Sequence, residues 1–221
     1  MEKAPEVSGR RRVIAEAAVW LLCCAGAVCV AVLGLLSVGR LRSPVEIGRS
    51  FPALVVAQAF FLFLIWPIFW GAAEPEGDSP VRAAIGLLAR LVGLLVLAAP
   101  IVVVAMRTAD VTAGQVLWSQ AFVFLLGVTA GAGCRLPGAK LWYYPAALFL
   151  AGIVPFLAYL LREEGDLSMR WAGLISPVWA AGSVAAGGEV LWRMAVFGGL
   201  AAVAVLLWLW HLSRAAGPDH A

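Results

Sequence analysis

Few side chains in this 221-residue chain have the type and spacing needed for catalysis. The only two histidines, His211 and His220, lie near the C-terminus, and His211 is interpreted as an interfacial residue rather than a ligand or proton relay. There is no H-E-x-x-H, no G-x-S-x-G and no acidic pair inside an apolar segment. All four aspartates fall in connections or in the tail: Asp78, Asp110, Asp166 and Asp219. We therefore expect no enzyme activity, and keep an intramembrane enzyme only as a third alternative.

Cofactor signatures are also missing from the sequence. It contains no G-x-x-x-x-G-K-[ST] phosphate-binding loop and no C-x-x-C-H haem attachment site. The four cysteines have no C-x-x-C spacing, and a free cysteine inside an apolar segment behaves as a small apolar residue. These are Cys23, Cys24, Cys29 and Cys134. No metal or cofactor is therefore expected on this chain.

Arg90 is the charged residue that we single out inside a long apolar segment. An ionisable residue in a membrane span is a functional hypothesis by default, so a transport role is one interpretation. The other is structural, because Arg90 stands seven positions after Ala83, about 10 Å along a helix, and could snorkel to the headgroups or pair with a partner. Three glutamines could line a polar pathway with it or join neighbouring helices by hydrogen bonds. They are Gln58, Gln115 and Gln120.

The segments that must position these residues are typical of a membrane protein. Hydrophobic residues make up 63% of the chain and the mean hydropathy is +0.94. Because a span needs about 20 apolar residues, the pattern predicts an all-α polytopic protein with six transmembrane helices. The expected spans cover residues 13–38, 51–72, 81–106, 112–134, 141–161 and 190–210. Polar ends are expected at 1–12 and 212–221, and Pro100 is expected to bend the third span.

Residues 171–188 are apolar but too short and too interrupted for a full span. The segment is interrupted by Ser176-Pro177, Gly182, Gly187 and Gly188. Irregular backbone at membrane depth is tolerated where protein surrounds it. We therefore predict a re-entrant hairpin before the last span.

Charge gives little information on partners or orientation. The net charge of +3 is too small and too scattered for a nucleic-acid interface. With an inside N-terminus, eight Lys and Arg residues lie inside and seven outside, which decides nothing. The Lys and Arg residues on the two flanks of the first span weakly favour an inside N-terminus.

Two stretches resemble the permeases of type-2 ABC exporters. Those proteins carry E-R-x-x-G-T-L-x-x-L-L-x-T-P-L-S and then I-x-x-G-K-L-L-A-R-L after the second span. Here Glu74 to Gly77 is similar to the acidic start, Ser79-Pro80-Val81 to the T-P-L step, and Ile85 to Leu91 to the G-K-L-L-A-R-L step. Leu174 to Pro177 resembles the L-S-P step of the re-entrant hairpin. Compared with those permeases, the segment that couples to the ATPase is shortened here, because the G-T-L-x-x-L-L part has no counterpart between Gly77 and Ser79.

The resemblance implies a permease subunit in the bacterial cytoplasmic membrane, with both termini cytoplasmic. ATP would bind to a separate ABC ATPase subunit, and the permease would form a homodimer or a heterodimer with a related chain among membrane lipids. It implies an ATPase-docking surface made of Glu74, Glu76, Ser79, Pro80, Arg82, Arg135 and Lys140. The alternative class is a non-catalytic structural or assembly subunit of a larger membrane complex. The transported substrate is not indicated by the sequence.

Overall fold

The computed structural model describes residues 5–37, 50–71, 79–157, 160, 175–188 and 190–215. Within these ranges the chain is helical apart from short turns and contains no strand. The all-helical prediction is therefore confirmed for them. The elements are α1 (Pro5–Ser37), α3 (Ser50–Phe60), η1 (Phe61–Ile65), α4 (Trp66–Gly71), α5 (Pro80–Ala109), α6 (Ala113–Gly133), α7 (Ala139–Leu148), η2 (Phe149–Ile153), α10 (Pro177–Ala185) and α11 (Val190–Ala215).

Among the described residues, five helices are long and apolar enough to cross a membrane. They are Arg11–Val32, Ser50–Trp70, Pro80–Ala109, Ala113–Gly133 and Val190–Arg214. The expected fifth span, 141–161, corresponds to a shorter apolar helix, Leu141–Leu157, formed by α7, η2 and the turn that follows. The helix α5 extends past the expected end at residue 106 because Asp110, at φ 50°, is the left-handed residue that terminates it.

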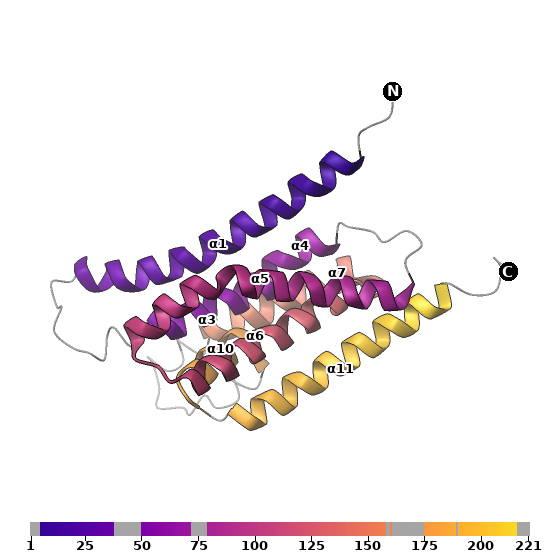
Figure 1. Ribbon diagram of the computed structural model, residues 1–221. Coiled ribbons are helices and arrows are strands. Elements are labelled where there is room, and N and C mark those ends of the chain that lie inside the picture. Colours follow the sequence, from indigo (N-terminus) through magenta and orange to yellow (C-terminus); the bar gives the residue numbers. More distant parts are fainter. Residues whose placement is uncertain are drawn as a thin grey trace.

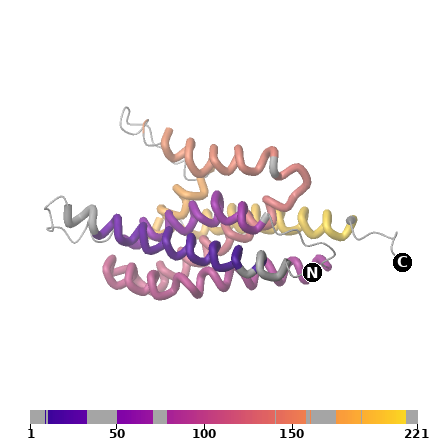
Figure 2. The backbone as a smooth tube through the Cα atoms, turned by 90° about the horizontal axis from the view of Figure 1, so that it is seen from above, coloured from indigo at the N-terminus to yellow at the C-terminus, as the bar shows by residue number. Residues whose placement is uncertain are grey.

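The continuous helix α3–η1–α4 and helix α6 form the centre of the bundle. In each, 56% of the most apolar window is buried, against 22% in α1, 28% in α5 and 11% in α11. The helices α1, α5 and α11 therefore lie at the periphery and expose apolar side chains where lipid would be. Figures 1 and 2 show α5 and α7 on opposite sides of this central pair.

The helix ends gather at two opposite ends of the bundle. Figure 1 shows the first turns of α1, the start of α5 and the last turns of α11 at one end, which we call the Ser79 end. The turn 134–138 also lies there, because Arg135 donates a hydrogen bond to the carbonyl of Trp70 at the end of α4. The turn around Asp110 marks the opposite end, which we call the Asp110 end.

Two π-helical turns each end shortly before a proline. The turn η1 is followed by Pro67 and the turn η2 by Pro155, in each case two residues after its last residue. Proline has no N–H and its ring crowds the carbonyl four residues earlier, so a local change of helical register relieves the crowding. The carbonyl of Phe63, four residues before Pro67, instead accepts a hydrogen bond of 2.8 Å from the buried hydroxyl of Tyr143 on α7.

The short helix α10 is inserted among the long ones. It packs against α3 and α6, and Pro177, Val178, Ala181 and Val184 are among its buried residues. The buried Ser176 caps its start by accepting a hydrogen bond from the N–H of Trp179 at 3.2 Å. Gly187, with φ 79°, reverses the chain after it and lies beside Gln115 at the start of α6. The helix α10 therefore ends at the Asp110 end.

We predict that Tyr143→Phe lowers the free energy of unfolding by about 1 kcal/mol, since the Phe63 carbonyl then loses its donor in an apolar region. Tyr144→Phe is the matched control, because it removes a neighbouring hydroxyl that is only partly buried. Thermal or denaturant unfolding of the purified protein in mild detergent measures both. Equal losses in the two variants would show that the Tyr143 bond contributes nothing specific.

Candidate functional site

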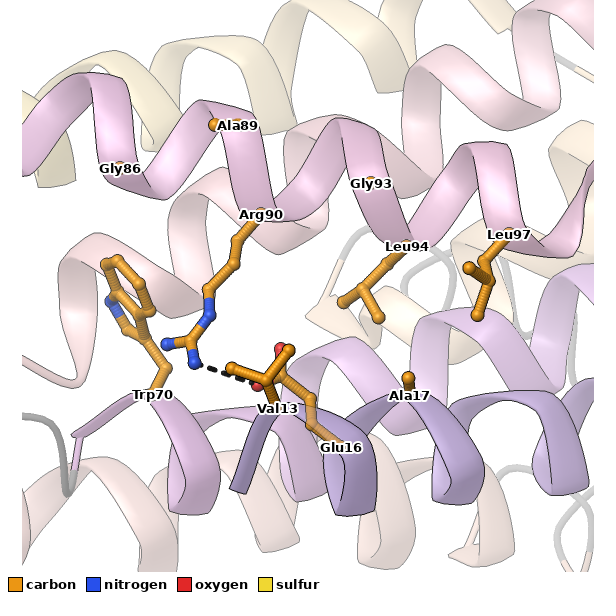
Figure 3. A pocket seen from close by; sticks show the side chains of 10 residues that line it. All are labelled: Val13, Glu16, Ala17, Trp70, Gly86, Ala89, Arg90, Gly93, Leu94 and Leu97. Carbon is orange, nitrogen blue, oxygen red and sulfur yellow. Dashed lines mark ion pairs between the residues drawn. The ribbon is translucent and has the colours of Figure 1, made fainter. Parts of the chain in front are cut away.

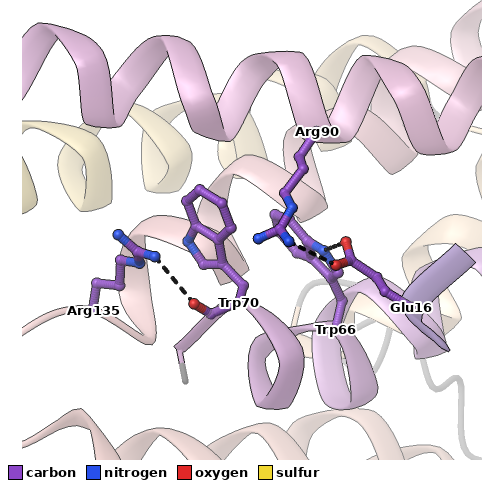
Figure 4. A network of polar contacts seen from close by, with 5 residues as sticks. All are labelled: Glu16, Trp66, Trp70, Arg90 and Arg135. Carbon is purple, nitrogen blue, oxygen red and sulfur yellow. Dashed lines mark hydrogen bonds and ion pairs between the residues drawn. The ribbon is translucent and has the colours of Figure 1, made fainter. Parts of the chain in front are cut away.

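A cluster of charged and indole side chains joins four parts of the chain near the Ser79 end. Figure 4 shows Glu16 of α1, Trp66 and Trp70 of α4, Arg90 of α5 and Arg135, which follows α6. Trp66 and Trp70 are one helical turn apart, and their rings stack with centroids 5.6 Å apart at 19°. Their stacked rings form the centre of the cluster.

Glu16 and Arg90 form an ion pair between α1 and α5. The distance from Arg90 Nη2 to Glu16 Oε2 is 3.4 Å, and the side chains are 25% and 3% exposed respectively. The other carboxylate oxygen, Oε1, accepts a hydrogen bond of 2.7 Å from Trp66 Nε1. Burying a carboxylate this deeply removes its negative charge from water at a cost in free energy. The guanidinium of Arg90 and the indole N–H of Trp66 offset that cost.

Trp70 lies between two guanidinium groups. Arg90 Cζ is 5.2 Å from the centroid of its ring and Arg135 Cζ is 4.0 Å from it, so both make cation–π contacts. Arg135 Nη2 also donates to the Trp70 carbonyl at 3.1 Å, and Trp70 Nε1 donates to the Gly131 carbonyl at 3.1 Å. Arg135 Cζ is 5.9 Å from the ring of Trp208, which brings α11 into the same cluster.

Close packing of α6 against α5 allows these contacts. A Cβ atom added at Gly131 would lie 2.4 Å from Leu87 Cδ1 and 2.9 Å from an atom of the Trp66 ring. A Cβ added at Gly127 would lie 2.5 Å from Leu91 Cδ2. Glycines spaced four apart let two helix backbones approach, as the G-x-x-x-G pattern does in membranes.

A groove opens beside the ion pair, between α1 and α5 (Figure 3). Its volume is about 550 Å³. Figure 3 shows Glu16, Arg90 and Trp70 at one part of it, with Leu94 and Leu97 farther along α5. The complete lining is Val13, Glu16, Ala17, Trp70, Gly86, Ala89, Arg90, Gly93, Leu94 and Leu97.

The polar residues expected to line a pathway do not meet in one place. Gln120 Nε2 donates to Gln58 Oε1 at 2.9 Å, which joins α6 to α3. Gln115 caps the start of α6 by a reciprocal arrangement with Thr112. Arg90 belongs to the ion pair with Glu16 instead.

The residues expected to dock an ATPase are placed in part. Ser79 caps α5 by accepting a hydrogen bond from the N–H of Arg82, and Pro80 is the first residue of that helix. Arg82 is exposed, whereas Arg135 is half-buried and held in the cluster around Trp70. Glu74 and Glu76 lie outside the described residues, and Lys140 is placed only as a position in α7.

Glu16 and its indole partners were not identified from the sequence. The signal was present, because Glu16 is an acidic residue inside the predicted first span, and such a residue is a functional hypothesis by default. Glu16 stands alone in that span rather than as part of an acidic pair. Its pairing with Arg90 is a tertiary contact that no local pattern contains.

Comparisons with known proteins add no family to this description. No family model matches the chain, and neither the curated proteins nor the solved structures gave a match. The resemblance to ABC exporter permeases therefore stays a proposal.

We predict that Arg90→Gln destabilises the protein by about 3 kcal/mol, because it leaves the buried Glu16 charge without its cation. The double variant Glu16→Gln/Arg90→Gln restores part of this loss, since no uncompensated charge remains. Unfolding of both variants and of Glu16→Gln in detergent gives a double-mutant cycle. Additive losses across the cycle would contradict an energetic coupling between the two residues.

Proposed function

We propose that this chain is the permease subunit of an ATP-driven exporter of the ABC-2 type, working with a separate ATPase subunit. Six membrane crossings and a re-entrant hairpin before the last one form its layout. Two copies, or one copy and a relative, form the transport pathway between them. The observation that carries this proposal is the short helix α10.

The dimensions and position of α10 support a re-entrant segment. Its nine residues rise about 13 Å, roughly half of the ~30 Å hydrocarbon core. Ile175 and Pro177, at its start, line a cavity of about 320 Å³ together with Phe63, Tyr143 and Phe197 from three other helices. The segment therefore begins inside the bundle and runs out to the Asp110 end. The other arm of the hairpin, before residue 175, lies outside the described residues.

The Ser79 end supports the proposed position of the ATPase. It carries the exposed Arg82 and the capped start of α5, a helix of 30 residues that reaches the opposite end. A partner that pushes on the start of α5 would move Arg90 against Glu16 and Trp70. The ion pair would then transmit the movement to α1 and α4.

Membrane sidedness tests the six-crossing layout. We predict that a cysteine at Ser79 reacts with an impermeant thiol reagent only from the cytoplasmic side, and a cysteine at Asp110 only from the other side. Asp166, which lies outside the described residues, is expected on the same side as Asp110. The background protein has Cys23, Cys24, Cys29 and Cys134 replaced. Labelling of Ser79 and Asp110 from one side would reject the layout.

Association with an ATPase tests the function itself. We predict that the chain copurifies with its cognate ATPase after coexpression, and that Arg82→Glu weakens the complex by reversing a charge on the docking surface. Arg107→Glu is the matched control, because Arg107 is also exposed and lies on the same helix near the Asp110 end. Absence of any complex, together with unchanged function after deletion of Glu74–Pro80, would reject the permease proposal.

The second candidate is a structural or assembly subunit of a larger membrane complex. It is favoured by the hydrogen bond between Gln120 and Gln58, which uses these glutamines to join α6 to α3. Isolation of the chain in a stable complex that contains no ATPase would support this candidate.

A further inference from the structure

The groove between α1 and α5 has the features of a binding site for a lipid chain. Figure 1 shows the two helices diverging toward the Ser79 end, and the groove lies between them. Its α5 wall is formed largely by small residues on one helical face, Gly86, Ala89 and Gly93, followed by Leu94 and Leu97. An added Cβ at Gly93 would meet no atom within 4 Å, so this wall leaves open space.

The length of the groove corresponds to one leaflet of a bilayer. From Gly86 to Leu97 the helix rises about 16 Å, and half of a ~30 Å hydrocarbon core is about 15 Å. A transmembrane helix of a second copy crosses the full hydrocarbon core and would extend beyond this groove. An acyl chain from the leaflet at the Ser79 end needs only this length.

Charge at the open end of the groove favours an anionic headgroup. Arg82 is exposed and stands one turn before Gly86 on the same face of α5. Arg90, partly exposed, projects from the same helix into the groove (Figure 3). Because Arg90 is paired with the Glu16 carboxylate, the cation complementary to a phosphate group is Arg82, near the mouth of the groove.

We propose that this groove binds an anionic phospholipid, with its phosphate near Arg82 and one acyl chain along Gly86, Gly93 and Leu97. The site belongs to the chain by itself. It requires neither an ATPase nor a transport activity, so it stands or fails separately from the proposed function.

Native mass spectrometry of the full chain in mild detergent tests this site. The protein is titrated with phosphatidylglycerol and with phosphatidylcholine of the same acyl chains. We expect phosphatidylglycerol to bind about fivefold more tightly, and Arg82→Gln to remove most of that preference. Gly93→Leu, which fills the groove, removes the tight adduct.

Gly199→Leu is the matched control, because Gly199 on α11 also has no atom within 4 Å of an added Cβ. It should bind phosphatidylglycerol like the parent protein, and circular dichroism should show equal helix content in all variants. Equal affinity for the two lipids, or an unchanged adduct in Gly93→Leu, would overturn the proposal. A protein dimer that is lost only in Gly93→Leu would also overturn it and assign the groove to a second copy.

Discussion

Hydrocarbon offers no hydrogen-bond partner, so each polar group inside a span must be satisfied by protein. Among the described residues, polar contacts between different helices meet this requirement, and four of them illustrate it. Trp20 Nε1 donates to the Leu94 carbonyl at 2.6 Å and ties α1 to α5, as the Glu16–Arg90 pair also does. The other two link Tyr143 with Phe63 and Gln120 with Gln58. In lipid, apolar packing alone does little to select which helices become neighbours. Such polar contacts therefore specify the arrangement of the helices.

The positions of the helices could be predicted from sequence because length and hydropathy define a span. Ser50, Pro80, Ala113 and Val190 each begin a helix within a residue or so of the predicted boundary. The π-helical turns could not be predicted from Pro67 and Pro155 alone. A proline can be accommodated by a kink, a register change or a water, and the choice depends on what packs against the freed carbonyl.

Only part of the candidate site could be predicted from the sequence, because its contacts also depend on how the helices pack. A lone Arg90 in a span signals that a partner exists, but the identity of the partner depends on how α1 packs against α5. Trp66 and Trp70 lie near the end of a predicted span, where indoles generally favour the headgroup level. Instead the structure buries both, with Trp66 holding a carboxylate and Trp70 lying between two guanidinium groups. Burial of an indole is a tertiary property that position in a span does not reveal.

The two candidate functions make different demands on the Glu16–Arg90 pair. Desolvating two charges costs free energy that their attraction only partly returns, so a buried ion pair is weak evidence for stability alone. The pair has a separation of 3.4 Å, and Glu16 Oε2 accepts no hydrogen bond. A subunit that only holds a complex together would gain as much from leucines at both positions. A subunit whose α1 and α5 must separate and rejoin in one register gains from a contact that is specific in position and modest in strength. That property, together with the open groove beside the pair, favours the candidate permease, whose helices must move, over the candidate structural subunit.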